Sequence, residues 1–246
     1  MAFKSPQNTT ASGARAKIDA ARAQDRRRAA RKRNMTIVAS LVAAFAVIVA
    51  VFLAVDPGSG PDGDTLAAGE SRYVRSDSHR LTTAADGKVT LVEFLDFECE
   101  ACRGMYPLVE SLRKEYEGRV TFVVRYFPLP GHFNAERAAR AVEAAAQQDK
   151  FEIMYQRMYQ TQTEWGEKRT PADEYFRGLA QGLGMDMAAW QKAYEDPATL
   201  ARVKKDVADG QALGVQGTPT FYLNGTLVQV QMQDDLKKAI DAALAG

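Results

Sequence analysis

Cys99 and Cys102 are the only cysteines of this 246-residue chain, and two residues separate them. Side chains three positions apart on a helix lie on one face, so these two thiols can close a disulfide. A cysteine at a helix N-terminus meets the positive end of the helix dipole and free N–H groups, which favour its thiolate. The pattern predicts a redox centre in which the more exposed Cys99 attacks and Cys102 resolves.

Two other uses of such a cysteine pair are a structural disulfide and a zinc site. A structural disulfide across two residues closes too short a loop to constrain much of the unfolded chain. A zinc site needs two more ligands, and besides carboxylates the sequence offers only His79 and His132. Redox chemistry is therefore favoured, and we expect neither a metal nor a cofactor.

The segments around the cysteines predict a βαβ unit. Residues 88–97 (KVTLVEFLDF) and 119–127 (RVTFVVRYF) are short and rich in β-branched and aromatic residues, as in buried strands. Residues 101–116 between them carry apolar side chains at helical spacing. A strand, a helix and a second strand in this order form a parallel pair. Cys99 then falls where the first strand gives way to the helix.

The remainder of the chain predicts a long helical insertion and a hairpin. Residues 134–213 show helical spacing and almost no strand signal, and they are too many for a loop. Short strands follow at 220–223 and 227–231, joined by the turn-forming pair Asn224-Gly225, and a last helix is expected at 233–244. The fold class is α/β, with a mixed sheet whose two halves are separated by helices.

Glu93 is a carboxylate among apolar neighbours. By the two-residue period of a strand it shares a face with Leu91, Leu95 and Phe97. Burial without a partner would raise its pKa, and such an acid below the cysteines can exchange a proton with Cys102. The alternative is an edge-strand carboxylate that reaches solvent.

Pro219 directly precedes the predicted strand at 220–223. Proline donates no hydrogen bond to a sheet, so it marks the start or edge of a strand. The Thr218–Pro219 bond is a plausible cis peptide, because the cis form of an X-Pro bond costs only about 0.5–1 kcal/mol. An ordinary trans turn is the alternative.

The combination of Glu93, Cys99-x-x-Cys102, a helical insertion and Gly-Thr-Pro-Thr before a strand resembles the DsbA-like branch of the thioredoxin superfamily. The segment 125–135 (RYFPLPGHFNA) is similar as well, and the resemblance covers about 88–245. It implies a thioredoxin-like fold with a helical insertion and a cis Pro219 packed against the cysteines. It also implies disulfide exchange with exported proteins and a membrane redox partner that reoxidises the pair.

The residues beside the cysteines bear on the direction of exchange. Family oxidants commonly carry His before the second cysteine, whereas this chain has Glu100 and Ala101. A carboxylate next to Cys99 should raise the pKa of its thiol and weaken the oxidant. With Thr218, these two residues are expected to contact substrate.

The expected function is an oxidase of exported proteins. A disulfide reductase or isomerase that keeps the pair as a dithiol is the alternative within the enzyme class. A non-catalytic binding protein would instead use the helical insertion, with the Met and aromatic stripe from Phe151 to Tyr159 as a groove.

The N-terminal part predicts a membrane anchor. Residues 1–34 carry ten Lys or Arg and two Asp, a net charge of +8, so the remainder carries −7 of the total of +1. Residues 35–55 are 21 uncharged, mostly apolar residues, enough for a helix to span a bilayer. The basic cluster keeps the N-terminus in the cytoplasm and sends the rest of the chain across.

A cleaved signal peptide is the alternative, although its apolar region is usually shorter. The basic arm suits topology and anionic lipid better than nucleic acid, so no nucleic-acid partner is expected. The expected organisation is a cytoplasmic arm at 1–34, a single transmembrane helix at 35–55, a flexible linker at 56–85 and a thioredoxin-like domain at 86–246, with its insertion at about 134–213. This places the catalytic domain outside the cytoplasm.

Overall fold

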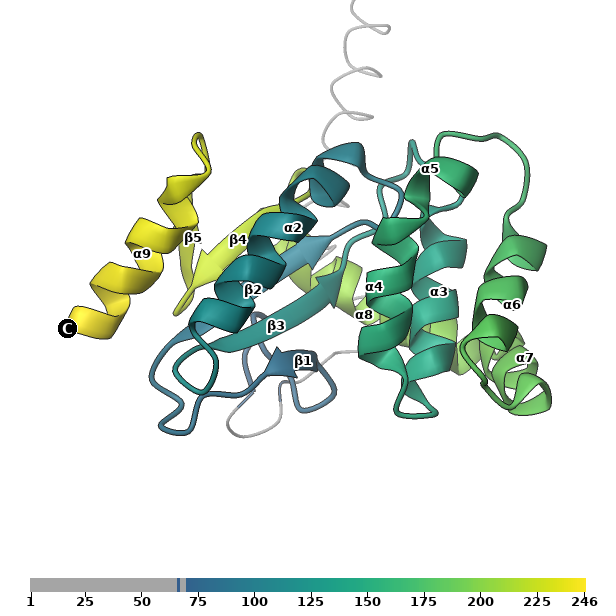
Figure 1. Cartoon of the computed structure of the whole chain (residues 1–246), viewed down its shortest axis with the longest axis horizontal. Coiled ribbons are helices and arrows are strands. Elements are labelled where there is room, and N and C mark those ends of the chain that lie inside the picture. The colour runs from purple at the N-terminus through teal and green to yellow at the C-terminus, as the bar shows by residue number, and fades with distance from the viewer. Residues whose placement is uncertain (1–65, 67–69) are drawn as a thin grey trace, which may run out of the picture. The chain divides into compact units, whose positions relative to one another are not determined.

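The computed structural model describes residue 66 and residues 70–246, whose strands form one mixed sheet in the order β1-β3-β2-β4-β5 (Figure 1). The strands are β1 (His79–Thr82), β2 (Thr90–Leu95), β3 (Thr121–Tyr126), β4 (Thr220–Leu223) and β5 (Thr226–Val228). The helices are α2 (Glu100–Glu115), α3 (Ala135–Ala146), α4 (Phe151–Gln160), α5 (Gln162–Trp165), α6 (Asp173–Gly182), α7 (Met187–Glu195), α8 (Pro197–Ala212) and α9 (Asp234–Ala245). β2 and β3 are parallel, and the other neighbouring strands are antiparallel. The predicted βαβ unit is confirmed.

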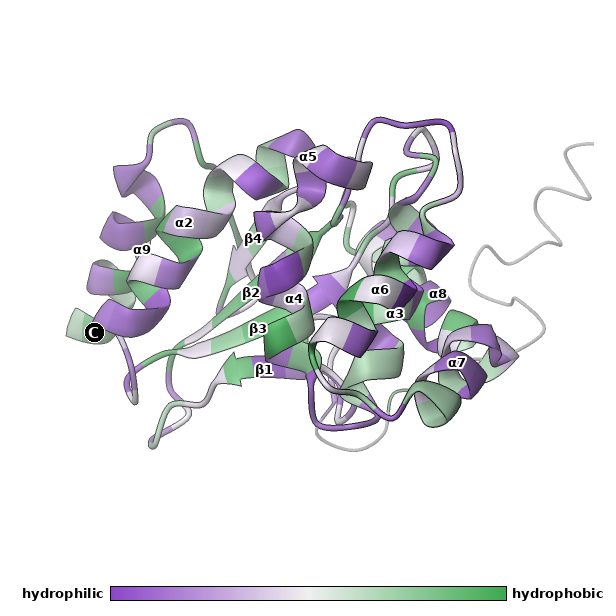
Figure 2. Cartoon of the chain, turned by 45° about the vertical axis from the view of Figure 1, so that its right-hand side comes forward, coloured by the Kyte–Doolittle hydropathy of each residue, from purple (hydrophilic) through white to green (hydrophobic). Residues whose placement is uncertain are grey.

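The central strand β2 is buried on both faces, which explains its apolar sequence. Leu91 and Leu95 pack into the larger core, together with residues of α2, α4 and α9. Val92 and Phe94 point to the opposite face and pack in a smaller core that Val207 of α8 adjoins. In Figure 2 much of β2 and β3 is coloured hydrophobic, while the outward side of α9 is largely coloured hydrophilic.

The helical insertion is confirmed and runs from α3 to α8. The Ala-rich α3 lies at its centre, in contact with α4, α6, α7 and α8. Small side chains allow helices to approach α3 closely. The interpretation of the Met and aromatic stripe as an exposed groove is wrong, because its members on α4 are buried: Met154, Tyr155, Met158 and Tyr159.

The folded domain starts earlier than the predicted boundary at residue 86. Strand β1 lies within the predicted linker and pairs with β3. Arg75 is 1% exposed and donates to Asp209 of α8. The sequence gives no strand signal for β1, because this strand is only four residues long and carries two basic side chains, His79 and Arg80.

The predicted arm at 1–34 and the predicted span at 35–55 lie outside the described residues. In the part of the chain that the structure describes, no helix is both long and apolar enough to cross a membrane. The hairpin turn is confirmed: Asn224 and Gly225 take positive φ values of 49° and 79°, as a tight turn between β4 and β5 requires.

Candidate active site

Cys99 and Cys102 lie at the N-terminal end of α2, directly after the loop that follows β2. Cys99 is the N-cap residue with extended backbone angles (φ −68°, ψ 122°), and Cys102 lies in the first helical turn. Cys99 is 8% exposed and Cys102 is 0% exposed. The strand-to-helix junction therefore leaves Cys99 slightly exposed and encloses Cys102 completely.

The two thiols have opposite acidities. The pKa of Cys99 is lowered to about 5, chiefly by a hydrogen bond from the Cys102 side chain. The Thr218 side chain and the backbone N–H groups of Cys102 and Ala101 add to this lowering, which outweighs the effect of partial burial. Burial, the adjoining Cys99 and the charge of Glu93 raise the pKa of Cys102 well above its usual value. The hydrogen bonds lower the pKa of Cys99, as expected for a cysteine at a helix N-terminus, and the opposing effect expected of Glu100 stays a prediction.

The segment 218–219 lies against the cysteines although it is more than a hundred residues away in sequence. The Thr218–Pro219 peptide bond is cis, and the Cys99 thiol donates to the backbone oxygen of Thr218 at 3.3 Å. Thr218 and Pro219 are partly exposed, while Glu100 and Ala101 are exposed at the start of α2. The predicted substrate-contact residues thus surround Cys99 on the accessible side.

Glu93 lies in the middle of β2, opposite Val124 of β3 and Phe221 of β4. It is 5% exposed, so the edge-strand alternative is wrong. Its pKa is raised to about 8, first by burial and second by the negative charge of Glu110. Its charge acts on the Cys102 thiol, which places this acid on the inner side of the cysteine pair.

Gln162 of α5 is a site residue that sequence reasoning missed. Its Nε2 donates to the backbone oxygens of Phe97 at 2.7 Å and Cys99 at 2.9 Å, and its Oε1 accepts from Arg103 Nε at 2.9 Å. The helical insertion therefore holds the cysteine loop by its backbone. A single polar residue in a long helical stretch gives no signal of such a contact.

Asp96 and His132 form a second support that the sequence did not reveal. Asp96 Oδ1 accepts from the N–H of Glu98 at 2.8 Å, and its Oδ2 pairs with His132 Nδ1 at 2.6 Å. Burial acts to lower the pKa of His132, but Asp96 outweighs it and the pKa is raised, with the charge of Cys99 contributing. The loop after β3 thus brings an imidazole into the electrostatic environment of the thiolate.

A cavity of about 400 Å³ adjoins the residue that precedes Cys99. It is lined by Glu98, Pro130, Gly131, His132, Phe133, Glu167, Lys168 and Arg169. The Glu98 carboxylate accepts from the N–H groups of Asn134 at 2.6 Å and Glu167 at 3.1 Å, so it ties this rim together. Phe133 is 43% exposed and offers apolar surface near the cysteines.

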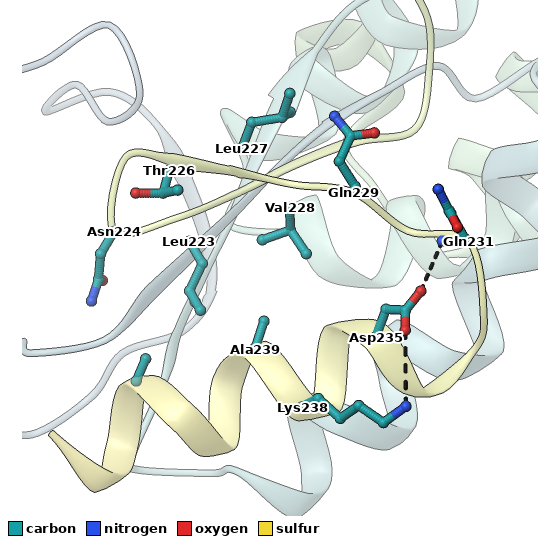
Figure 3. A pocket seen from close by; sticks show the side chains of 11 residues that line it. Leu223, Asn224, Thr226, Leu227, Val228, Gln229, Gln231, Asp235, Lys238 and Ala239 are labelled. Carbon is teal, nitrogen blue, oxygen red and sulfur yellow. Dashed lines mark hydrogen bonds and ion pairs between the residues drawn. The ribbon is translucent and has the colours of Figure 1, made fainter.

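A larger cavity of about 700 Å³ lies at the β5 edge of the sheet, between β4, β5 and α9 (Figure 3). Val228 and Leu223 point toward Ala239 across it, and Asp235 closes one end through the N–H of Gln231 at 2.9 Å. None of the predicted site residues is among the described residues that line it. Size alone therefore does not identify the redox site.

The sequence is similar to parts of several longer curated proteins. The chain is 33% identical over 144 residues to a Na(+)/H(+) antiporter NhaA of Herminiimonas arsenicoxydans, a match that covers 57% of this chain and 21% of that protein. The chain spans less than a third of the length of the curated relatives it matches. The antiporter name belongs to those whole proteins and is not carried over to this chain.

Solved structures match over most of their length. A thioredoxin-like oxidoreductase from Silicibacter pomeroyi is 29% identical with a TM-score of 0.59, covering 73% of this chain and 99% of that one. Oxidised BdbD from Bacillus subtilis is 22% identical with a TM-score of 0.59, covering 67% and 92%, a likeness that shows the fold. The family model described as Thioredoxin matches residues 78–242, well over half of the sequence. The chain belongs to the thioredoxin family.

Proposed function

We propose that this chain is a thiol-disulfide oxidoreductase that oxidises cysteine pairs of exported proteins through Cys99 and Cys102. The observation that carries the proposal is the contrast between the two thiols, since the pKa of Cys99 is about 5 and that of Cys102 is well above its usual value. A stabilised thiolate favours the reduced form, which makes the disulfide more oxidising.

The exchange runs in two steps. A substrate thiolate attacks the Cys99 sulfur of the Cys99–Cys102 disulfide, and Cys102 leaves and takes up a proton. The second substrate thiolate then attacks the substrate sulfur of the mixed disulfide, and Cys99 leaves as a thiolate. The substrate loses two electrons and two protons, of which Cys102 keeps one and solvent takes the other. The low pKa of Cys99 makes it a good leaving group in the second step.

Glu93 is suited to the proton transfer at Cys102. A group with a pKa of about 8 holds its proton at neutral pH and gives it up readily, which lets one carboxyl serve as acid and base. In the oxidising direction it protonates the departing Cys102 sulfur. In the reverse direction its carboxylate accepts the proton of the attacking Cys102.

Substrate is proposed to bind over the exposed side of the pair. Thr218 contacts the Cys99 sulfur and precedes the cis Pro219, while Glu100 and Ala101 directly follow Cys99 on α2. An extended substrate segment there can approach the sulfur in line with the disulfide. The exposed ring of Phe133, on the neighbouring cavity, adds apolar contact.

We further propose that the domain works outside the cytoplasm, anchored in the lipid bilayer by residues 35–55. The sequence of that segment and the basic residues before it support this topology. An oxidase must itself be reoxidised, so a membrane redox partner that accepts electrons from the cysteine pair is part of the proposal. Neither nucleic acid nor a metal has a role in it.

The reduction potential of the domain, equilibrated against glutathione, tests the direction of exchange. A value near about −120 mV is expected for an oxidant, and a value near about −270 mV would instead identify a reductant that keeps its dithiol. Cys99→Ser in the same assay removes the redox couple and serves as the control.

The roles of the two cysteines are tested by trapping. Cys102→Ser should accumulate mixed disulfides with substrate proteins, because the buried thiol that would resolve them is gone. Cys99→Ser should trap few or none, since Cys102 is fully buried. Equal trapping by the two variants would overturn the assignment of Cys99 as the attacking thiol.

A further inference from the structure

Buried polar atoms gather between β2, α2 and α4, on the inner side of the cysteine pair. The hydroxyls of Tyr155 and Tyr159 and Oε1 of Glu110 are buried, and none of these atoms has a hydrogen-bond partner among the described residues. Glu93, which is 5% exposed, lies in the same region, since its charge acts on both tyrosines. Buried polar groups without partners are rare in folded proteins, so three such atoms beside a buried acid call for an explanation.

The two tyrosines, Glu110 and Glu93 form one cluster. The Tyr155 and Tyr159 rings pack edge to face, with centroids 5.4 Å apart. The charge of Glu93 acts on both tyrosines and on Cys102. Glu110 acts in turn on Glu93 and on Tyr155. The cluster therefore reaches from the buried thiol to Glu110 on the third turn of α2.

Glu110 connects this cluster to the surface. Its Oε2 accepts from Arg113 Nη2 at 2.8 Å, and the same nitrogen donates to Glu152 at 2.6 Å. Glu110 and Arg113 also line an open cavity of about 360 Å³, together with Thr82, Lys114 and Glu117. One carboxylate oxygen of Glu110 thus lies in the buried cluster, while the side chain as a whole is half-buried and borders the open cavity.

We propose that Tyr155, Tyr159 and Glu110 line a path along which protons pass between Glu93 and solvent at the cavity beside Arg113. Tyrosine hydroxyls both donate and accept, and a carboxylate accepts, so with bridging water these groups form a continuous hydrogen-bonded chain. Cys102, the thiol on which the charge of Glu93 acts, is fully buried. The path lets Glu93 be recharged without opening the covered side of the redox centre.

This inference rests on the proposed function and deepens it. When Cys102 leaves the disulfide, its sulfur takes the proton of Glu93, and Glu93 becomes a carboxylate. A proton from solvent then enters beside Glu110 and returns Glu93 to its neutral form. In the reverse reaction the same path carries the Cys102 proton outward. Electrons move only between sulfur atoms, and the path carries protons alone.

Glu110 is a positioning residue in this scheme, because it touches neither substrate nor sulfur. The groups that face Glu93 and its path are Cys102, Tyr106, Glu110 and Arg113 of α2, Tyr155 and Tyr159 of α4, and Asp96 after β2. Glu110 is the one whose charge raises the pKa of Glu93. Its removal should therefore shift the protonation of Glu93 to lower pH.

The test compares Glu110→Gln with Glu117→Gln, an exposed acid on the rim of the same cavity. Two quantities are followed against pH in the full chain: the rate of disulfide exchange, and the carboxyl infrared band of Glu93 identified by its loss in Glu93→Gln. Glu110→Gln should move both midpoints to lower pH by about half a unit or more, while Glu117→Gln leaves them in place. Identical profiles for the two variants would overturn the role of Glu110.

Tyr159→Phe tests the path itself, since it removes the hydroxyl and keeps the ring. The exchange rate at neutral pH should fall by about threefold or more, with a changed solvent isotope effect and an unchanged Cys99 pKa. An unaltered rate and isotope effect would overturn the path. The infrared midpoint reports on Glu93 even if no substrate is exchanged, so failure of the proposed function, seen as an inactive wild type, remains distinguishable.

Discussion

The two faces of the sheet bury charge in opposite ways. On the face covered by α8, Arg125 donates to Asp206 at 2.6 Å and to Asp209 at 2.6 Å, and Asp209 also accepts from Arg75. These four side chains are at most 1% exposed, and their charges are paired. On the face covered by α2 and α4, Glu93 is buried without such a partner and its pKa is raised to about 8.

The difference separates a structural use of buried charge from a chemical one. Although burial acts to raise it, the pKa of Asp209 is lowered by the hydrogen bonds from Arg75 and Arg125. Asp209 therefore stays ionised and fixes Arg75, in the segment just before β1, to α8. Glu93 instead has an acidity near neutral pH, which costs stability but allows proton transfer. Two neighbouring parallel strands supply these groups: β2 carries Glu93 on one face of the sheet, and β3 carries Arg125 on the other.

The largest expected effect comes from breaking the paired face. Asp209→Asn removes the buried carboxylate that pairs with both Arg75 and Arg125, and it should lower the free energy of unfolding by about 3–5 kcal/mol. Urea unfolding measures this loss. Because the network lies on the opposite face from the cysteines, the thiolate titration of Cys99 should not change. A shift of that titration would show that the two faces are coupled.

A smaller effect of opposite sign is expected on the unpaired face. Because the folded pKa of Glu93 is raised from 4.5 to about 8, the unfolded chain releases this proton more easily, and stability falls as pH rises from about 4.5 to 8. Glu93→Gln removes this dependence and should add about 3 kcal/mol to the free energy of unfolding at pH 7. It should also slow exchange between pH 5 and 8.

Unfolding of wild type and Glu93→Gln at pH 5 and pH 8 checks this prediction. The two stabilities should converge toward pH 5 and separate toward pH 8. Parallel pH profiles would show that Glu93 is not protonated in the folded state. If exchange rates also matched across this range, Glu93 would have a structural role only.

The sequence predicts part of the fold and part of the candidate site, because local periodicity carries that part. The strands, the insertion and the cysteine junction follow from local periodicity, and Glu93 stood out because its neighbours on the strand are apolar. Gln162, His132 and Glu110 did not stand out, because their roles depend on contacts between segments far apart in the chain. A polar residue on a helix or loop is ordinary until tertiary structure shows what it faces.

The acidity of Cys99 follows from the sequence only in part. The helix N-terminus predicts a stabilised thiolate, whereas the largest lowering of the pKa comes from Cys102, and Thr218, far away in the chain, adds to it. The contact with Thr218 exists only in the folded chain, so the sequence alone could not show it.

The next effect sharpens the contrast between the two thiols. Cys102→Ala removes the largest contribution to the low pKa of Cys99, which should rise from about 5 by about one to two units. Ultraviolet thiolate absorbance against pH measures it, and Cys99→Ala identifies the signal by abolishing it. A pKa that stays near 5 in Cys102→Ala would assign the stabilisation to the helix N-terminus and Thr218 instead.

The smallest expected effect concerns Glu100, which tests whether exposed charge matters beside these buried contributions. Two charges about 4 Å apart interact by roughly 4 kcal/mol at an effective dielectric constant near 20, but exposure and salt reduce this severely. Glu100→His removes repulsion and adds attraction when protonated, so the Cys99 pKa should fall by about one unit or less. Since about 30 mV corresponds to 1.4 kcal/mol, the reduction potential should rise by tens of millivolts. Glu100→Gln, which only removes the charge, should produce a smaller rise. If both variants leave the thiolate titration and the potential unchanged, Glu100 points away from the sulfur, and the acidity of Cys99 is set entirely by the hydrogen bonds beneath it.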